Sequence, residues 1–379
     1  MTPSPRTFEE LDNWAILRRF LPAGWKEQAR ASGALKRARG IAGPEALLRI
    51  LLIHLANGCS LAETSVRARQ AGLGQLSAVA LFKRVRAAEG WLCWLAQQIR
   101  GGGPLPAAGE GRRWRVVDAT SISEPGSTGT DWKIHYAINL ENLQCDFFEL
   151  TPISEGGETF RRVPVQAQDL MMGDRVYASP PGIAHVLEAH GDVLVRVNRQ
   201  ALPLFDPRGS RLPLLRVLRG MKAGQPYEWE ARARRPQGGW LLGRLIAIRR
   251  SATATRLERE RLLQRANRRQ EKVSAESWEA AAYFMLWTSL PSSFAAPSVL
   301  DSYRFRWQIE LAFKRMKSIM ALGHLPKADP ASSRAWLHGK LLVGLLVERM
   351  ITSAHAFSPW GYALEMPPQP VERSRIHAS

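Results

Sequence analysis

The chain has 379 residues, of which 53 are Lys or Arg and 34 are Asp or Glu, so its formal net charge is +19. This length excludes a mini-protein, and a composition of 45% hydrophobic and 23% charged residues excludes wholesale disorder, so we expect about two or three folded domains. The large excess of positive charge indicates a polyanionic partner, for which nucleic acid is the commonest choice and a membrane surface the rival.

Three features of the chain bear on its location. The richest apolar stretch, residues 46–56, contains an Arg and a His and is shorter than the roughly 20 apolar residues of a spanning helix. Residues 1–12 carry three acids and no apolar run, which does not fit a secretory signal. Cys59, Cys93 and Cys145 lack the spacing of a zinc site or a disulfide framework. We therefore predict a cytoplasmic protein that makes no contact with membranes.

Helices are predicted from the N-terminus to about residue 103. Apolar residues recur at intervals of three and four over residues 47–55, and Ser60 with Glu63 has the spacing of a capping box. A turn at 72–75 separates the helix that begins there from a basic helix that starts at Ser77. This pattern fits a helix-turn-helix that docks on DNA, and it fits plain packing of two helices equally well.

Strands and helices alternate after the Gly-rich linker at 101–104. This alternation indicates an α/β core, and the second and third strands form a hairpin. The predicted strands are 114–117, 132–140, 145–151, 175–178 and 192–197, and the predicted helices are 164–171 and 181–190.

The second half of the chain is first β-rich and then helical. Residues 201–248 have the pattern of strands and turns, with 227–232 and 240–248 as partners. A basic helix is expected at 249–272, where a solvated face and contact with a DNA backbone remain equally open interpretations. A buried strand at 283–288, helices at 298–320 and 335–350, and a loose tail after residue 358 complete the prediction.

Three carboxylates stand out as candidate chemical groups. Asp118 follows an apolar strand and Asp174 precedes another, although an Asp in an ordinary turn explains either one by itself. Glu310 shares one side of a predicted helix with Tyr303, Arg306 and Lys317, where the simpler interpretation is an intrahelical salt-bridge ladder.

The sequence lacks the motifs of histidine metal sites and of nucleotide-binding sites. His135 lies on a predicted strand, where a core histidine is the simpler interpretation, and the remaining His residues show no metal-ligand spacing. The chain has neither a Walker loop nor a dinucleotide fingerprint, so we expect no nucleotide cofactor.

The series Tyr303-x2-Arg306-x3-Glu310-x6-Lys317 resembles the signature helix of bacterial insertion-sequence transposases of the DDE type. The resemblance extends upstream, because the blocks around Asp118 and Asp174 are similar to the first-acid and second-acid blocks of that family. A basic strand, 194–196, follows the second block. All three acids occur in the family's order between about residues 113 and 350.

The resemblance implies a fold and its divisions. It implies an α/β, ribonuclease H-like catalytic core, interrupted by a β-rich insertion and preceded by a helical N-terminal domain. We expect the helical, DNA-binding domain at 1–105, the core at 106–200 and 289–357, the insertion with its basic helix at 201–288, and a flexible tail at 358–379.

The resemblance also implies a chemistry. Asp118, Asp174 and Glu310 would be the catalytic residues and would share two Mg²⁺ or Mn²⁺ ions, because these hard cations prefer oxygen ligands. DNA phosphates would contact Tyr303, Arg306 and Lys317, with Arg175 and Arg196 as further contacts, and Trp307 would stack on a base.

The expected activity is cut-and-paste transposition, in which the enzyme cuts the ends of an element and joins them to target DNA. The expected partners are the terminal inverted repeats and target DNA, bound by a homodimer associated with the bacterial nucleoid. Two alternatives remain, namely a ribonuclease H-fold DNA nuclease without strand transfer and a non-catalytic DNA-binding protein derived from a transposase.

Overall fold

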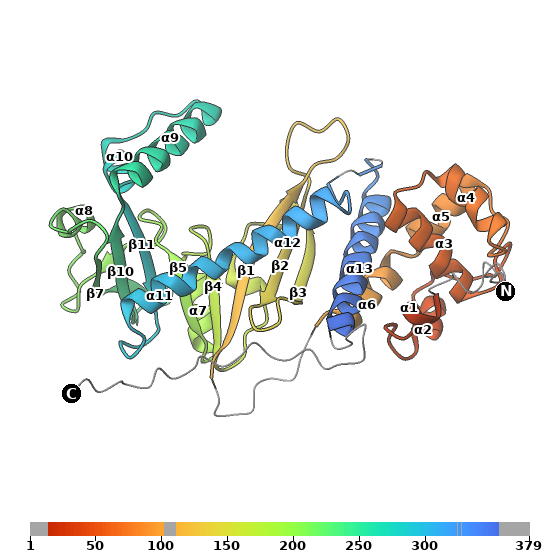
Figure 1. The fold of residues 1–379 in the computed structure, drawn as a ribbon, viewed down its shortest axis with the longest axis horizontal. Helices are drawn as coiled ribbons and strands as arrows, with labels where there is room; N and C mark the ends of the chain where they lie inside the picture. The colour runs from red at the N-terminus through yellow and green to blue at the C-terminus, as the bar shows by residue number, and fades with distance from the viewer. Residues whose placement is uncertain (1–13, 102–110, 324, 327, 356–379) are drawn as a thin grey trace, which may run out of the picture. The chain divides into compact units, whose positions relative to one another are not determined.

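A computed structural model describes residues 14–101, 111–323, 325–326 and 328–355. The chain divides into two compact units, one formed by residues 1–99 with 329–379 and the other by residues 100–328. Figure 1 shows the elements of both units, and each unit is described separately below. The predicted tail after residue 358 lies outside the described residues.

The described part of the first unit is built from helices. Ser60 accepts a hydrogen bond from the Glu63 backbone N–H (3.1 Å), and Ser77 accepts one from Ala80 (3.2 Å), so both predicted helix starts are confirmed. The helices are α1 (Trp14–Arg18), α2 (Trp25–Ala31), α3 (Pro44–Asn57), α4 (Leu61–Gln70), α5 (Ala78–Ala87), α6 (Glu89–Ile99) and α13 (Pro330–His355).

Helix α13 belongs to this first unit, although 289–357 was expected to be part of the catalytic core. Its buried apolar residues, among them Leu337, Leu341 and Leu345, form a stripe at helical spacing. The helix packs chiefly against α6 and also contacts α3 and α5. The unit boundary therefore falls near residue 329, because this stripe is buried by helices that lie far upstream in the sequence.

The second unit contains an eight-stranded mixed sheet with the strand order β3-β2-β1-β4-β5-β11-β10-β7. Strands β1, β4 and β5 run parallel to one another, and all other neighbours are antiparallel. The strands are β1 (Arg113–Ile122), β2 (Trp132–Asn139), β3 (Cys145–Pro152), β4 (Asp169–Gly173), β5 (Asp192–Arg196), β7 (Pro226–Glu230), β10 (Arg244–Arg249) and β11 (Tyr283–Thr288).

Strands from the segment 201–288 lie in two sheets. Strands β7, β10 and β11 extend the large sheet, whereas β6 (Leu204–Phe205), β8 (Arg232–Arg234) and β9 (Trp240–Leu241) form a small one. Strand β7 is an outer edge, and its exposed residues include Glu228 and Glu230. The helices of the second unit are α7 (Pro180–Glu188), α8 (Leu214–Leu218), α9 (Ala252–Arg269), α10 (Ala275–Ala280), α11 (Ala296–Ser302) and α12 (Trp307–Ser318).

The large sheet presents two different faces. Val117, Met171 and Val195 point into a hydrophobic core that also contains buried residues of α7. Because successive residues of a strand alternate between faces, their neighbours in sequence point to the opposite face. Helix α12 crosses that opposite face (Figure 1), where Phe313 contacts Tyr136 of β2 with ring centroids 5.9 Å apart.

Three local predictions were wrong. Residues 164–171 are not helical, because their apolar end, with Leu170 fully buried, belongs to strand β4. Residues 175–178 form a bend rather than a strand, so β4 comes before Asp174 and not after it. Strand β1 continues through Asp118 to Ile122, since its whole length pairs with β2.

The predicted helix 298–320 is interrupted. A 3-10 turn (Tyr303–Arg306) separates α11 from α12, so Tyr303 and Glu310 do not share one regular α-helix. A tertiary contact accompanies the turn, because the Tyr303 hydroxyl donates a hydrogen bond to the backbone oxygen of Gly173 (3.0 Å). Among the described residues, none of the helices combines the length and apolarity that a bilayer crossing requires.

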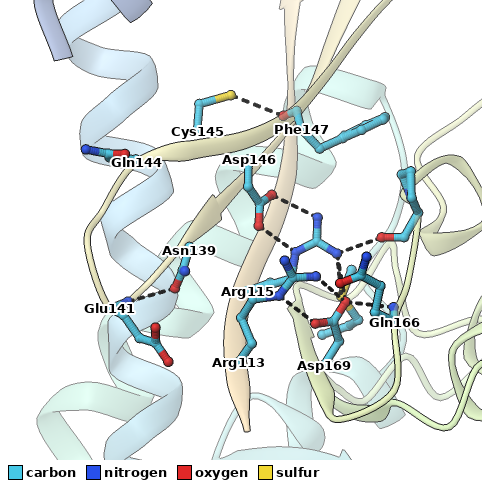
Figure 2. A network of polar contacts seen from close by, with 12 residues as sticks. Arg113, Arg115, Asn139, Glu141, Gln144, Cys145, Asp146, Phe147, Gln166 and Asp169 are labelled. Atoms are coloured by element: carbon cyan, nitrogen blue, oxygen red, sulfur yellow. Dashed lines mark hydrogen bonds and ion pairs between the residues drawn. The ribbon is translucent and has the colours of Figure 1, made fainter. Parts of the chain in front are cut away.

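A buried ion network ties three strands together at the start of β1 (Figure 2). Arg115 is bonded through two nitrogens to Asp146 of β3 (2.7 and 2.8 Å), and it also reaches Asp169 of β4 (3.0 Å). Arg113 donates two further hydrogen bonds to Asp169 (2.7 and 2.8 Å). Burial alone would lower the pKa of Arg115, but its carboxylate partners raise it above the ordinary value. The two Arg and two Asp charges balance.

Candidate active site

Asp118 lies in β1, and Asp174 directly follows the parallel neighbour β4, at the same level. The last paired residues of β1 and β4 are Val116 and Met172, and continuing this register by two residues sets Asp118 beside Asp174. Both side chains belong to the face of the sheet that α12 covers, because the intervening Val117 points to the other face. The structure thus brings together the first two predicted acids.

The carboxyl group of Asp118 is electrostatically strained. Burial is the largest cause, and together with the negative charges of Asp174 and Glu158 it raises the pKa of Asp118 to about 7. A hydrogen bond from the Ala119 backbone N–H (2.8 Å) and the charge of Arg306 oppose this rise only in part. In the protein alone, the charges of Asp118 and Asp174 are therefore only partly compensated by neighbouring groups.

Arg306 links Asp118 to Glu310. One guanidinium nitrogen of Arg306 lies 3.6 Å from a carboxylate oxygen of Asp118, and another forms an ion pair with Glu310. Glu310 lies in the first turn of α12, and its side chain is 45% exposed. The third predicted acid is thus connected to the first through a cation rather than by direct contact.

Two side chains attach the signature segment to the strands that carry the acids. Tyr303 bonds to the oxygen of Gly173, the residue before Asp174, and Lys317 donates a hydrogen bond to the oxygen of Ser121 in β1 (3.1 Å). Burial is the largest cause of a raised pKa at Tyr303, so its hydroxyl stays protonated. Trp307 remains 59% exposed, which leaves its ring open to a stacking partner.

Gly173 has no room for a larger side chain. A Cβ atom at this position would lie 2.7 Å from the Cβ of Tyr177 and 2.9 Å from a ring atom of Phe160. Such contacts are too close for a side chain, so glycine allows β4 to deliver Asp174 next to this aromatic pair.

Sequence reasoning missed Glu158. It forms an ion pair with Lys133 (2.6 Å), and its charge contributes to the raised pKa of Asp118. Nothing in the local sequence marks this residue, because it lies in a connection between 3-10 turns and its partner is 25 residues away. Only the packing of the strands places it near the acids.

Arg175 and Arg196 point to a neighbouring cluster of charges. Arg196 forms an ion pair with Glu258 of α9 (3.2 Å), and its guanidinium lies 5.4 Å from the ring centroid of Phe284. The buried Nε atom of Arg175 has no hydrogen-bond partner. Burial, followed by the charge of Arg196, lowers the pKa of Arg175 to about 10, which leaves the group charged at neutral pH.

The residues present fit a divalent cation in part. No group of three Asp, Glu, His or Cys side chains in the described part of the chain is placed to hold a metal ion. Asp118 and Asp174 supply the oxygen donors that Mg²⁺ and Mn²⁺ prefer, and a cation between them would offset the burial and the charge of Asp174, which together raise the pKa of Asp118. Glu310 as a further ligand stays a prediction.

The family model of the transposase DDE domain matches residues 110–346. The chain belongs to the family of DDE transposases of bacterial insertion sequences, enzymes that act on DNA and use divalent metal ions. The chain is 34% identical over 357 residues to the putative transposase InsL of insertion sequence element IS186A from Escherichia coli, which covers 92% of this chain and 96% of that protein. The transposase of insertion sequence element IS421 from Escherichia coli is also 34% identical, over 358 residues, with the same coverage.

Proposed function

We propose that this transposase catalyses cut-and-paste transposition, in which it cuts both ends of its element and joins the freed 3′ ends to target DNA. The observation that carries the proposal is the pair of Asp118, in β1, and Asp174, directly after the adjacent β4, beside Arg306 and Tyr303 of the signature segment. Asp118, Asp174 and Glu310 would hold two Mg²⁺ ions, with Mn²⁺ as a substitute. The bound ions supply the Lewis acidity that phosphodiester cleavage needs.

The chain's own residues position the DNA. Arg306 and Lys317 carry positive charge to the edge of the carboxylate pair, where charge-assisted hydrogen bonds hold a phosphate group in place. Tyr303 fixes the 3-10 turn against β4, so Arg306 approaches Asp118 in a defined orientation. Because Trp307 is exposed at the start of α12, it stacks on a base next to that phosphate.

The catalytic core would be of the ribonuclease H type. The strand order β3-β2-β1-β4-β5, in which only β2 runs antiparallel to the other four strands, supports this assignment. The N-terminal helices would bind the terminal inverted repeats, with the Ser77-capped helix α5 and its basic residues as one contact. A homodimer would hold the two ends, one in each subunit.

The test uses DNA that carries both boundaries of the element, incubated with the protein, Mg²⁺ and a supercoiled target. We expect cleavage at the boundaries and covalent joining of the 3′ ends to the target. Asp118→Asn, Asp174→Asn and Glu310→Gln should each abolish both products and keep DNA affinity. Glu141→Gln, which changes an exposed turn of the same unit, is the matched control and should retain activity.

Two results would contradict the proposal. Cleavage without joining would make the protein a nuclease. Binding without cleavage, unchanged by all three acid substitutions, would make it a DNA-binding protein without catalytic activity.

A further inference from the structure

A cavity of about 510 Å³ lies in the second unit, next to the carboxylate pair but separate from it. Helices α9 and α10 line it together with residues 197–200, which follow β5. Its size is that of a small-ligand site. Five cationic side chains line it, namely Arg175, Arg199, Arg265, Arg269 and Lys272.

Only two acids line the same cavity, Glu258 and Glu271. Glu258 forms ion pairs with several cations. It lies 3.2 Å from Arg196, 3.4 Å from Arg265 and 3.9 Å from Arg261. Burial would raise the pKa of Glu258, but the charges of Arg196, Arg250 and Arg265 lower it below the ordinary value. Its charge is therefore shared, and the cavity keeps an excess of positive charge.

Arg175 contributes a buried donor to this positively charged cavity. Its Nε is buried and has no hydrogen-bond partner in the described part of the chain, although a guanidinium normally satisfies its donors when it leaves water. Five cations, Arg175, Arg196, Arg250, Arg261 and Arg265, surround the single carboxylate of Glu258. An anionic ligand in the cavity would complete this arrangement, because an unpaired buried donor is costly.

We propose that the cavity binds phosphate groups of the DNA backbone, as a second anchor beside the carboxylate pair; the proposal rests on the proposed function. Arg175 directly follows Asp174, so the cavity begins one residue away from a catalytic acid. Guanidinium groups match the geometry of phosphate oxygens. Arg269 and Lys272 are exposed residues of the cavity lining, so a strand entering from the surface meets two cations there, with the acid Glu271 between them.

The experiment compares two double variants that each remove two positive charges. Arg269→Gln with Lys272→Gln changes the cavity, whereas Arg256→Gln with Arg268→Gln changes exposed positions of the same helix that do not line it. Binding of a fluorescent DNA duplex is measured in EDTA over a range of KCl concentrations. The cavity variant should reduce the slope of log affinity against log salt by about 1.8, since each lost phosphate contact removes about 0.9.

The matched variant should leave the slope nearly unchanged, and circular dichroism should show both variants folded. Equal slopes for the two variants would overturn the proposal, because α9 would then be a diffuse basic surface. Titration with inorganic pyrophosphate is the second arm. Pyrophosphate that binds the wild type, combined with an unchanged DNA slope in the cavity variant, would overturn the assignment to DNA.

Failure of this inference is distinct from failure of the proposed function. Binding in EDTA requires no catalysis, so a wild type that cuts nothing can still show the difference in slope. Conversely, a wild type that cuts and joins DNA while both variants bind alike would retain the transposition proposal and lose the anchor.

Discussion

The two ends of the strand pair β1 and β4 place their acids in opposite electrostatic environments. At the start of the pair, Asp169 is fully buried and bonded to both Arg113 and Arg115 (Figure 2). At the other end, Asp174 directly follows β4 and lies beside Asp118, whose pKa is raised to about 7. One cation, Arg306, reaches Asp118 at 3.6 Å and is shared with Glu310. We call the first end the closed end, because its charges balance, and the second the open end, because its negative charges outnumber the positive ones.

The charge network at the start of the strand pair contributes to stability, whereas the acid pair at its end is suited to binding. A balanced network holds β1, β3 and β4 in register, and removing one partner leaves the others buried and unpaired. An unbalanced pair of acids costs folding free energy, and a site retains such a cost where it binds a cation or a substrate. The closed end thus fixes the register that places Asp118 next to Asp174.

The largest expected effect is at the open end. Asp118→Asn should reduce cleavage of element ends by about a thousand-fold or more, because an amide binds a divalent cation far less well than a carboxylate. The same substitution should not destabilise the protein, since it removes a charge that is unfavourable in the fold. The measurements are end cleavage and urea unfolding at pH 8, and a large loss of stability would contradict the comparison.

At the closed end the expected effect is on stability. Asp169→Ala should lower the free energy of unfolding by about 3–5 kcal/mol, because it leaves Arg113 and Arg115 without their shared partner. The control is Glu149→Ala, which breaks a more exposed pair with Arg162 and should cost less than about 1 kcal/mol. Equal losses of unfolding free energy for the two variants would show that the buried network contributes no more than an exposed ion pair.

Stability should depend on pH through Asp118. The folded pKa of about 7 lies above the ordinary Asp value of 3.8, so the folded state binds the proton more tightly than the unfolded state. Its contribution is fully present below pH 3.8, is lost as the pH rises through about 7, and amounts to at most about 4 kcal/mol. Subtracting the Asp118→Asn melts from those of the wild type, at several pH values in EDTA, isolates this contribution. A flat difference would refute the raised pKa.

The smallest expected effect concerns Glu158. Glu158→Gln removes a negative charge near Asp118, so the pKa of Asp118 should fall by less than about one pH unit. The midpoint of the pH-dependent stability difference should therefore move to lower pH. Glu141→Gln, an exposed substitution in the same unit, should leave the midpoint in place. An upward shift with Glu158→Gln would show that its pairing with Lys133 dominates.

Much of the local structure was predictable because it depends on local patterns. The capped starts of α4 and α5, the hairpin of β2 and β3, and the buried strand β11 all follow from caps, turns and apolar runs. Strand β4 was not predictable, because its short apolar run, Leu170 to Met172, fits either a helix or a buried strand.

The candidate site was predictable only where residues stand close together in the sequence. The spacing of Arg306 and Glu310 is visible in the chain, and the structure pairs them. Glu158 and the buried Arg175 gain their roles from tertiary packing, which no local pattern records. The 3-10 turn at Tyr303 likewise accompanies a bond to Gly173, 130 residues upstream.

The outer strand β7 bears on the tendency of the protein to aggregate at high concentration. An unprotected sheet edge offers free backbone donors and acceptors to a second molecule, and fibrillar aggregation begins in this way. Pro226 removes one donor at the start of this strand, and Glu228 and Glu230 are exposed on it, paired with Arg244 (2.6 Å) and Arg232 (3.1 Å). A second copy that added its own β7 would have to remove these ion pairs from water and would meet the missing donor of Pro226. This border of the sheet therefore opposes polymerisation and helps the newly made enzyme to remain dispersed.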